Sequence, residues 1–476
     1  MGVVEQFAYA KLRISTNRQI SRIMSSSADL PPAFIQQMKS ILGEEFTAFC
    51  AALETPSPIS VHWNSLKIKK WEENYNGVKW HNKGVYLDER PSFTLDPSFH
   101  AGAYYVQEAS SMFTALAAQQ VCDWDRPLKV LDLCAAPGGK STLLASILPE
   151  GSWLLSNEVI KGRYQVLRYN LDKWGHPNTF SAQHDPEDFL PLAGFFDLVL
   201  VDAPCSGEGL FRKDPAARLE WSPESVALCA ARQGRILRAA EQLVAPGGVL
   251  LYSTCTYNTQ ENDQNAQWLQ HSFALDFLPL ELPAEWQISE RSPGYQLYPH
   301  RVRGEGFYLA AFRQKADHRI RRKVLPFKKL KPVGSKLSDS IRHWVSDKDQ
   351  IAWFSTPQDN WRAIDQGQLA DTQILSSVLN RLEVGVYAGH FKGKNWIPSP
   401  EWALHHWCSP QVPTVALDRP TAIGYLRKET PALPELPKGW AAVSYEGLKL
   451  GWIKGLGHRY NNYYPKHWRI RMQEKK

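Results

Sequence analysis

Four apolar stretches between residues 129 and 255 alternate with helical stretches, and this alternation limits the possible folds more than any other feature. The apolar stretches are KVLDL (129–133), SWLLSNE (152–158), FDLVLVD (196–202) and GGVLLYSTC (247–255). Near-continuous apolar strands separated by helices are typical of a parallel sheet that is covered on both faces. The pattern therefore predicts an α/β domain with a doubly wound, Rossmann-like sheet. We expect GEGFYLAAFR (304–313) to be its last strand.

The segments on either side of this sheet differ from it in pattern. Apolar residues at helical spacing in residues 30–50, followed by short strand-like stretches up to residue 108, predict a small α+β module. Residues 318–332, HRIRRKVLPFKKLKP, are basic without an acidic residue, which is typical of a solvated linker. The predicted division is a disordered extension (1–29), the N-terminal α+β module (30–125), the α/β domain (126–315), a basic linker (316–334), an intermediate α+β domain (335–411) and a small β-barrel domain (412–476).

Composition excludes several classes of protein. The chain has 476 residues, of which 43% are hydrophobic and 22% charged, and its formal net charge of +7 is compatible with binding nucleic acid. No run approaches the roughly 18 apolar residues of a membrane span. The 7 cysteines include no CxxC pair, which argues against a disulfide framework and a zinc site and for a reducing compartment. We therefore expect a cytoplasmic monomer without a membrane span or a metal ion.

A glycine-containing loop follows the first apolar stretch, in VLDLCAAPGGKST (130–142). Gly138 and Gly139 lack the Cβ atoms that would keep a ligand away from the backbone. The loop is not GxGxxG, which disfavours a pyrophosphate cofactor, although an ordinary Gly-Gly turn is the alternative. Glu158 follows the second stretch, where such folds hold a ribose. A ribose without a pyrophosphate indicates S-adenosyl-L-methionine.

Two cysteines follow the last two apolar stretches of this region. Asp202 and Cys205 come after one stretch and Cys255 after the next, and the strand ends lie ~5 Å apart if the strands are neighbours. A thiolate that adds to C6 of cytosine makes C5 nucleophilic, so that C5 accepts a methyl group. Asn258 and Glu261 form a capping-box-like pattern after Cys255, and a helix start lowers the pKa of a thiol. Each cysteine alone is explained as well by a buried structural role.

Three motifs, DLCAAPGGKST, DAPCSGEGLFRKDP and YSTCTYNTQEN, resemble those of the Sun-like (NSUN) RNA 5-methylcytosine methyltransferases. The layout of the chain resembles the bacterial RsmF-type enzymes of 16S rRNA, strongly over 30–313 and loosely over 335–476. The resemblance implies that Cys255 is the nucleophile and that Cys205 assists product release. The cofactor or catalytic contacts that it implies are Cys134, Ala135, Ala136, Pro137, Gly138, Gly139, Lys140, Glu158 for the ribose, Asp185 for the adenine, and Asp202 for the base or the methionine part.

The residues that contact RNA are less clearly marked. Arg212 and Lys213 follow the Cys205 motif, where phosphates or a surface turn would explain them equally. The C-terminal GLGHRYNNYYPKHWRIRM interleaves basic and aromatic residues and resembles a PUA-like domain, so we expect RNA contacts at Arg459, Tyr460 and Lys466. A β-barrel core would also use such aromatics. His62 stands where the family usually has arginine, which puts one RNA or domain contact in doubt.

The sequence therefore predicts an S-adenosylmethionine-dependent RNA (cytosine-C5)-methyltransferase that acts on 16S rRNA. Transfer RNA or 23S rRNA are alternative substrates. DNA cytosine methylation, with Cys205 as nucleophile, is disfavoured by the Cys255 motif and the PUA-like end. A non-catalytic ribosome-assembly factor is disfavoured because Lys140, Asp202, Cys205 and Cys255 are all present.

Overall fold

The computed structural model describes residues 30–69, 71, 76–315, 320, 322–334, 339–346, 350–435 and 437–473. The predicted disordered extension (1–29) lies outside these residues. Within them, no helix is both long and apolar enough to cross a membrane.

The centre of the molecule is a sheet whose parallel part runs in the order β7-β6-β5-β8-β9. Its strands are β5 (Lys129–Asp132), β6 (Trp153–Asn157), β7 (Thr179–Ala182), β8 (Phe196–Asp202) and β9 (Val244–Thr254). The predicted last strand is β13 (Phe307–Gln314), which pairs antiparallel with β9. Three short strands beyond β13 were not predicted: β10 (Leu275–Phe277), β11 (Ser289–Arg291) and β12 (Gly294–Leu297).

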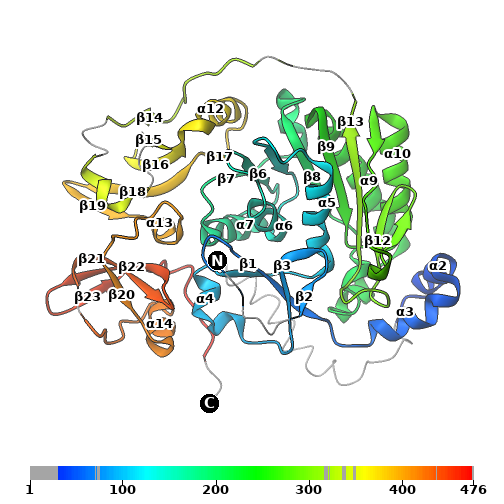
Figure 1. The fold of residues 1–476 in the computed structure, drawn as a ribbon, viewed down its shortest axis with the longest axis horizontal. Helices are drawn as coiled ribbons and strands as arrows, with labels where there is room; N and C mark the ends of the chain where they lie inside the picture. The colour runs from blue at the N-terminus through cyan, green and yellow to red at the C-terminus, as the bar shows by residue number, and fades with distance from the viewer. Residues whose placement is uncertain are drawn as a thin grey trace.

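Helices cover both faces of this sheet, as Figure 1 shows. The helices are α5 (Phe113–Val121), α6 (Gly139–Ala145), α7 (Lys161–Trp174), α9 (Pro223–Leu243) and α10 (Asn265–Ser272). Leu237 of α9 belongs to the apolar cluster on one face, whereas Leu143 of α6 belongs to the cluster on the other. Because both faces are buried, the strands are apolar without alternation, and the predicted doubly wound α/β fold is confirmed.

The N-terminal part contains several short helices and a small sheet, with strand order β2-β3-β1-β4. Its elements are α2 (Pro32–Leu42), η2 (Gly43–Glu45), α3 (Phe46–Leu53), β1 (Ile59–Trp63), β2 (Gly77–Val78), β3 (His81–Leu87), η3 (Phe93–Leu95), α4 (Pro97–His100), β4 (Tyr104–Val106) and η4 (Ser110–Met112). Phe34 and Phe49, from α2 and α3, pack against Phe211 and Tyr257, which follow the two cysteines in sequence. The N-terminal helices therefore support the loops that carry the cysteines.

His62 of β1 makes a contact between the N-terminal sheet and the central domain. Its side chain is fully buried, stacks on Tyr105 and has Nε2 3.3 Å from Oγ1 of Thr142 in α6. Burial lowers the pKa of His62 well below its ordinary value, so the ring is neutral. The position that the sequence left open between RNA and a domain contact is thus a domain contact.

The C-terminal third contains two further sheets, β14-β15-β16-β18-β19 and β20-β21-β22-β23. Their elements are β14 (Lys331–Pro332), η9 (Asp339–Trp344), β15 (Ile351–Ser355), β16 (Asn360–Asp365), η11 (Gln366–Gln368), α12 (Leu369–Val378), β17 (Leu382–Glu383), β18 (Val386–Lys392), β19 (Asn395–Pro398), α13 (Pro400–Leu404), β20 (Thr414–Ala416), α14 (Arg419–Leu426), β21 (Lys438–Tyr445), β22 (Leu448–Leu456) and β23 (Tyr460–Asn462). In Figure 1 both sheets lie on the opposite side of the central sheet from α2 and α3.

The predicted intermediate domain (335–411) does not stand apart from its neighbours. Strand β17 pairs with β7 at the edge of the central sheet, and Leu375 of α12 is part of the apolar cluster on one face of that sheet. On its other side, Trp402 of α13 shares an apolar cluster with Trp452 of β22. The sequence missed this because a two-residue edge strand has no detectable periodicity.

Candidate active site

The two predicted cysteines lie side by side at one edge of the central sheet. Strands β8 and β9 are parallel neighbours with Asp202 beside Ser253, so both strands end at the same edge. The loops that follow are joined by a hydrogen bond from the Gly209 amide to the Cys255 carbonyl, at 2.8 Å. Sγ of Cys205 lies 3.1 Å from Sγ of Cys255, and both thiols are half-buried. Both sulfurs therefore face a single small region.

The thiols of this pair are not equivalent. The hydrogen bond to Cys255, reinforced by burial, raises the pKa of Cys205 well above its ordinary value. Because the neighbouring sulfur and burial disfavour its ionised form, Cys205 keeps its proton and presents a thiol donor beside the Cys255 sulfur.

A lysine–aspartate ion pair lies beside the thiols. Nζ of Lys140 is 2.8 Å from Oδ2 of Asp202, and Oδ1 of Asp202 accepts a hydrogen bond from Ser253 Oγ at 2.8 Å. Nζ of Lys140 also lies 5.0 Å from the centre of the Phe307 ring. Burial opposes the charge on Lys140, but the carboxylate of Asp202 outweighs it and raises the pKa of the lysine. Lys140 is thus a fixed positive charge close to Cys255.

The predicted cofactor loop, Cys134–Lys140, joins the end of β5 to α6 along the same edge. Gly138 has φ of 112° and a Cβ there would lie 3.3 Å from Leu167 Cδ1, so both its conformation and close packing on α7 favour glycine. The Ala136 carbonyl accepts a hydrogen bond from Arg163 Nη2 at 2.7 Å, and the Ala135 amide donates to Asn157. Neighbouring elements therefore hold the loop in one shape.

Two buried carboxylates flank this loop. Glu158, after β6, accepts a hydrogen bond from the Ile160 amide at 2.8 Å, and its second oxygen lies 3.5 Å from Nε of Arg163. Asp132, at the end of β5, accepts a hydrogen bond from Ser141 Oγ at 2.6 Å, but its Oδ1 is buried without a hydrogen-bond partner among the described residues. Burial raises the pKa of Asp132 to about 7. Asp132 Oδ1, which has no hydrogen-bond donor in the described part of the chain, could face a positive charge, and Glu158 is the carboxylate expected to bind a ribose. Together they fit a cofactor that carries both a positive charge and a ribose.

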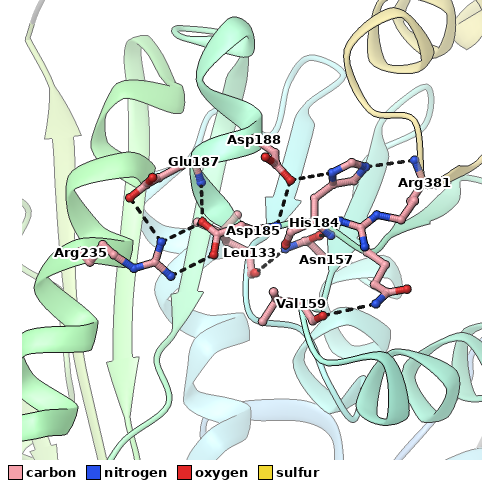
Figure 2. Close-up of polar contacts among 10 residues, drawn as sticks. Leu133, Asn157, Val159, His184, Asp185, Glu187, Asp188, Arg235 and Arg381 are labelled. Carbon is pink, nitrogen blue, oxygen red and sulfur yellow. Dashed lines mark hydrogen bonds and ion pairs between the residues drawn. The ribbon is translucent and has the colours of Figure 1, made fainter.

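Asp185 begins the turn after β7, where Figure 2 shows it facing Arg235 of α9. Its two oxygens lie 2.8 and 2.9 Å from the guanidinium, and it caps the following helical turn, η5 (Pro186–Leu192), through the Glu187 amide. The hydrogen bond from Arg235 lowers the pKa of Asp185. Asn157 ties this turn to the other strand ends, because its amide donates to the Leu133 and His184 carbonyls. Asp185 thus lies at the expected edge, but its carboxylate is paired with Arg235.

The capping pattern predicted after Cys255 is present in modified form. Oδ1 of Asn258 accepts a hydrogen bond from the Glu261 amide at 2.8 Å, as an N-cap does. Glu261 does not return to the backbone of Asn258 but accepts a hydrogen bond from its side-chain amide, at 2.7 Å. The helical turn that follows, η7 (Gln260–Gln264), is a π-helix.

The two residues predicted to contact RNA after Cys205 differ in their exposure to solvent. Arg212 is buried, with Nε 2.8 Å from Oε2 of Glu305, and it also donates to the Gly304 carbonyl. The charge of Arg212 is paired inside the protein in this structure, and its predicted phosphate contact stays a prediction. Lys213 is exposed and stays a prediction.

The residues predicted to contact RNA in the C-terminal sheet also differ in their exposure to solvent. Tyr460 is buried in the apolar cluster of the last sheet, and its hydroxyl donates to the Pro431 carbonyl at 2.7 Å. The ring belongs to the core, as the β-barrel alternative expects, and the predicted RNA contact of Tyr460 stays a prediction. Arg459 and Lys466 are exposed.

Sequence reasoning missed two residues that shape the site, Asp132 and Arg163. Asp132 could have been found as an acid in the last position of an otherwise apolar strand, which is where a doubly wound fold places its ligand. Arg163 has no such signal, because only the packing of α7 brings its guanidinium to the cofactor loop.

Comparison with known proteins agrees with this arrangement. Residues 121–313 match the family model of the 16S rRNA methyltransferases RsmB/F, residues 30–109 match the N-terminal domain of 16S rRNA methyltransferase RsmF, and residues 412–470 match the RsmF PUA domain. The chain is 30% identical to ribosomal RNA small subunit methyltransferase F of Enterobacter sp. (strain 638), over 93% of this chain and 96% of that protein.

Two solved structures from Pyrococcus horikoshii share the fold. A methyltransferase homologue is 27% identical with a TM-score of 0.51, covering 63% of this chain and 99% of that one. NSun6, described with SFG, is 20% identical with a TM-score of 0.51, covering 60% of this chain and 99% of that one. With a relative matched over nearly its whole length and three RsmF family models in their expected order, the chain belongs to the RsmF family of ribosomal RNA small subunit methyltransferases.

Proposed function

We propose that this protein methylates C5 of a cytosine in 16S rRNA with S-adenosyl-L-methionine as methyl donor. The observation that carries the proposal is the 3.1 Å separation of the Cys205 and Cys255 sulfurs, beside the Lys140–Asp202 ion pair. Methylation at oxygen or an exocyclic nitrogen has no need of paired thiols, whereas C5 of cytosine is a poor nucleophile and needs a covalent activator.

Cys255 is the proposed nucleophile. Its thiolate forms a bond to C6, and the electrons of the C5–C6 double bond move to C5, which then accepts the methyl group. Lys140 supports this step, because a fixed ammonium favours the thiolate over the thiol. The target cytosine must leave its stack to reach the sheet edge, as enzymes that act on bases require.

Cys205 is proposed to act after methylation. Solvent water takes the proton on C5, the electrons of that C–H bond re-form the C5–C6 double bond, and the bond between Cys255 and C6 breaks to leave its electrons on the Cys255 sulfur. Cys205 holds its proton 3.1 Å from the departing sulfur, so it is placed to donate a hydrogen bond to that sulfur as it regains negative charge.

S-adenosyl-L-methionine, when bound, supplies the electrophilic methyl group. The residues proposed to hold it are those of the loop Cys134–Lys140, with Glu158 for the ribose hydroxyls and Asp185 for the adenine once it exchanges its contact with Arg235. Asp202 is proposed to face the base or the methionine part, and Asp132 to offer its unpartnered oxygen to the positive charge.

Replacing the two cysteines should have different effects, which a denaturing gel with labelled 16S rRNA can distinguish. Cys255→Ala should transfer no methyl group and form no covalent adduct. Cys205→Ala should accumulate a protein–RNA adduct that survives denaturation. Cys229→Ala, which removes a half-buried thiol of α9, is the matched control and should behave as the unmodified protein.

Three outcomes contradict parts of the proposal. Adduct from Cys255→Ala but not from Cys205→Ala reverses the roles. Activity in both variants makes the thiols structural. Equal methylation of 23S rRNA or transfer RNA removes the assignment of 16S rRNA, and bisulfite sequencing of RNA from a strain without the gene identifies the modified nucleotide.

A further inference from the structure

Two glutamates lie behind the cysteine pair, one on each cysteine loop. Glu208 begins the turn η6 (Glu208–Leu210), three residues after Cys205, and Glu261 lies in η7, six residues after Cys255. Both side chains have no exposed surface. Neither takes part in the proposed chemistry, and a buried carboxylate needs partners for every oxygen.

The carboxylate of Glu208 crosses to the loop of the other cysteine. Its Oε2 accepts hydrogen bonds from the backbone amides of Tyr257 and Asn258, at 2.8 and 3.0 Å. Its Oε1 accepts from three side chains: Asn258 Nδ2 at 3.1 Å, Trp221 Nε1 at 3.1 Å and Gln37 Nε2 at 3.0 Å. Glu208 thereby fastens the segment directly after Cys255.

Glu261 makes the reverse contact. Its Oε2 accepts a hydrogen bond from the backbone amide of Ser206, the residue after Cys205, at 3.0 Å. The same oxygen accepts from Gln233 Nε2 at 2.7 Å, and that amide also reaches the Pro204 carbonyl at 3.1 Å. Glu261 thereby fastens the residues on both sides of Cys205.

We infer that Glu208 and Glu261 are positioning residues that fix the spacing of the two sulfurs through these crossed contacts. Strand pairing cannot do this, because the ladder between β8 and β9 ends at Asp202 and Ser253, before either cysteine. The carboxylates act by geometry rather than by charge, since a nearby negative charge disfavours a thiolate. Carboxylates suit the position because they accept several hydrogen bonds and donate none.

The inference rests on the proposed function for its catalytic consequence, but the spacing itself can be measured without RNA. Phenylarsine oxide bonds to two thiols at once and releases water, so its affinity reports whether two sulfurs lie close together. The binding of this probe to the full-length protein should depend on Cys205 and Cys255, and Cys205→Ala defines the level without a pair.

The test compares Glu208→Gln and Glu261→Gln with the matched control Glu305→Gln. Glu305 is also buried, but its carboxylate contacts Arg212 and Ser57 rather than the residues next to either cysteine. Both test variants should lose at least ~10-fold in arsenical affinity and ~10²-fold in kcat with KM for RNA unchanged, because misplacing a reacting group by about 1 Å has effects of this size. They should also accumulate adduct as Cys205→Ala does. Glu305→Gln should lose thermal stability without either change.

Glu261→Asp covers the case in which a glutamine variant fails to fold. It keeps the charge but shortens the side chain by one methylene, so its affinity for the arsenical should fall as that of the glutamine variant does. Full affinity in the aspartate variant would show that charge matters and would overturn the inference. Folded glutamine variants with the affinity and adduct level of the unmodified protein would overturn it as well. Absence of adduct in every variant, Cys205→Ala included, would instead refute the covalent route while the arsenical measurement still decides the spacing.

Discussion

The predicted site residues come together at the edge of the central sheet, whereas those of the C-terminal sheet are divided between the core and the surface. At the sheet edge, Lys140, Asp202, Cys205 and Cys255 come from three separate motifs and converge. In the C-terminal sheet, residues that are neighbours in sequence diverge: Arg459 is exposed while Tyr460 is buried.

The difference teaches which sequence patterns predict a site. Parallel strands bring their carboxyl ends to one edge, so a residue just after a strand is placed by the topology alone. The C-terminal stretch has no such common edge, because Arg459 lies just before β23 whereas Tyr460 is its first residue and packs into the core.

The largest effect should come from removing the positive charge at the sheet edge. Lys140→Ala should lower kcat by ~10²–10³-fold, because a preorganised charge beside the reacting group is lost. Single-turnover methylation of 16S rRNA measures it. Lys129→Ala is the matched control, since it breaks a comparable 2.7 Å ion pair with Asp371 at the first residue of β5, and it should leave kcat unchanged. Similar methylation rates for the two variants would show that Lys140 does not contribute to the chemical step.

A second effect tests the ribose assignment. Glu158→Ala should weaken S-adenosyl-L-methionine binding by about 2–3 kcal/mol, the size expected for charge-assisted hydrogen bonds to two hydroxyls. Calorimetry on the protein without RNA measures this directly. Glu187→Ala, which removes an exposed acid at the same edge, should change little, and an unaltered affinity for Glu158→Ala would contradict the assignment.

A third effect is a pH dependence of cofactor binding. With the pKa of Asp132 raised to about 7, this carboxyl is protonated below pH 7, and binding of a cation beside it must release the proton. Affinity should therefore fall as pH drops below 7, by at most about 10-fold per unit for one proton. Calorimetry in buffers with different ionisation enthalpies counts the proton, and Asp132→Asn should flatten the profile. If the cofactor affinity of the unmodified protein does not change with pH, Asp132 does not face the positive charge of the cofactor.

The smallest effects concern the C-terminal sheet. Replacing Arg459 and Lys466 by alanine should lower the salt slope of RNA binding by roughly 0.7–0.9 for each lost phosphate contact. Tyr460→Phe should leave RNA binding unchanged but reduce the free energy of unfolding by about 1 kcal/mol, because its hydroxyl bonds the Pro431 carbonyl inside the core. Loss of RNA affinity in Tyr460→Phe would show that the hydroxyl contacts RNA instead of bonding only within the core.

The sequence by itself determined the parallel sheet, its order of motifs and the residues at its edge, because strand periodicity and position after a strand are local properties. It placed Cys205 and Cys255 at the ends of two strands and left open whether those strands are neighbours, which the pairing of β8 with β9 establishes. It could not place the short strand β17 in the central sheet, nor show that His62 and Tyr460 are buried.

Tertiary structure alone decided the partners of the charged residues. Arg212 turns inward to Glu305, and Glu208 and Glu261 cross between the cysteine loops, because their partners come from distant parts of the chain. A charged residue in a sequence fits a phosphate, a surface or a buried partner equally well. Only the packing that removes it from water, and supplies the donors or acceptors that replace water, distinguishes these three.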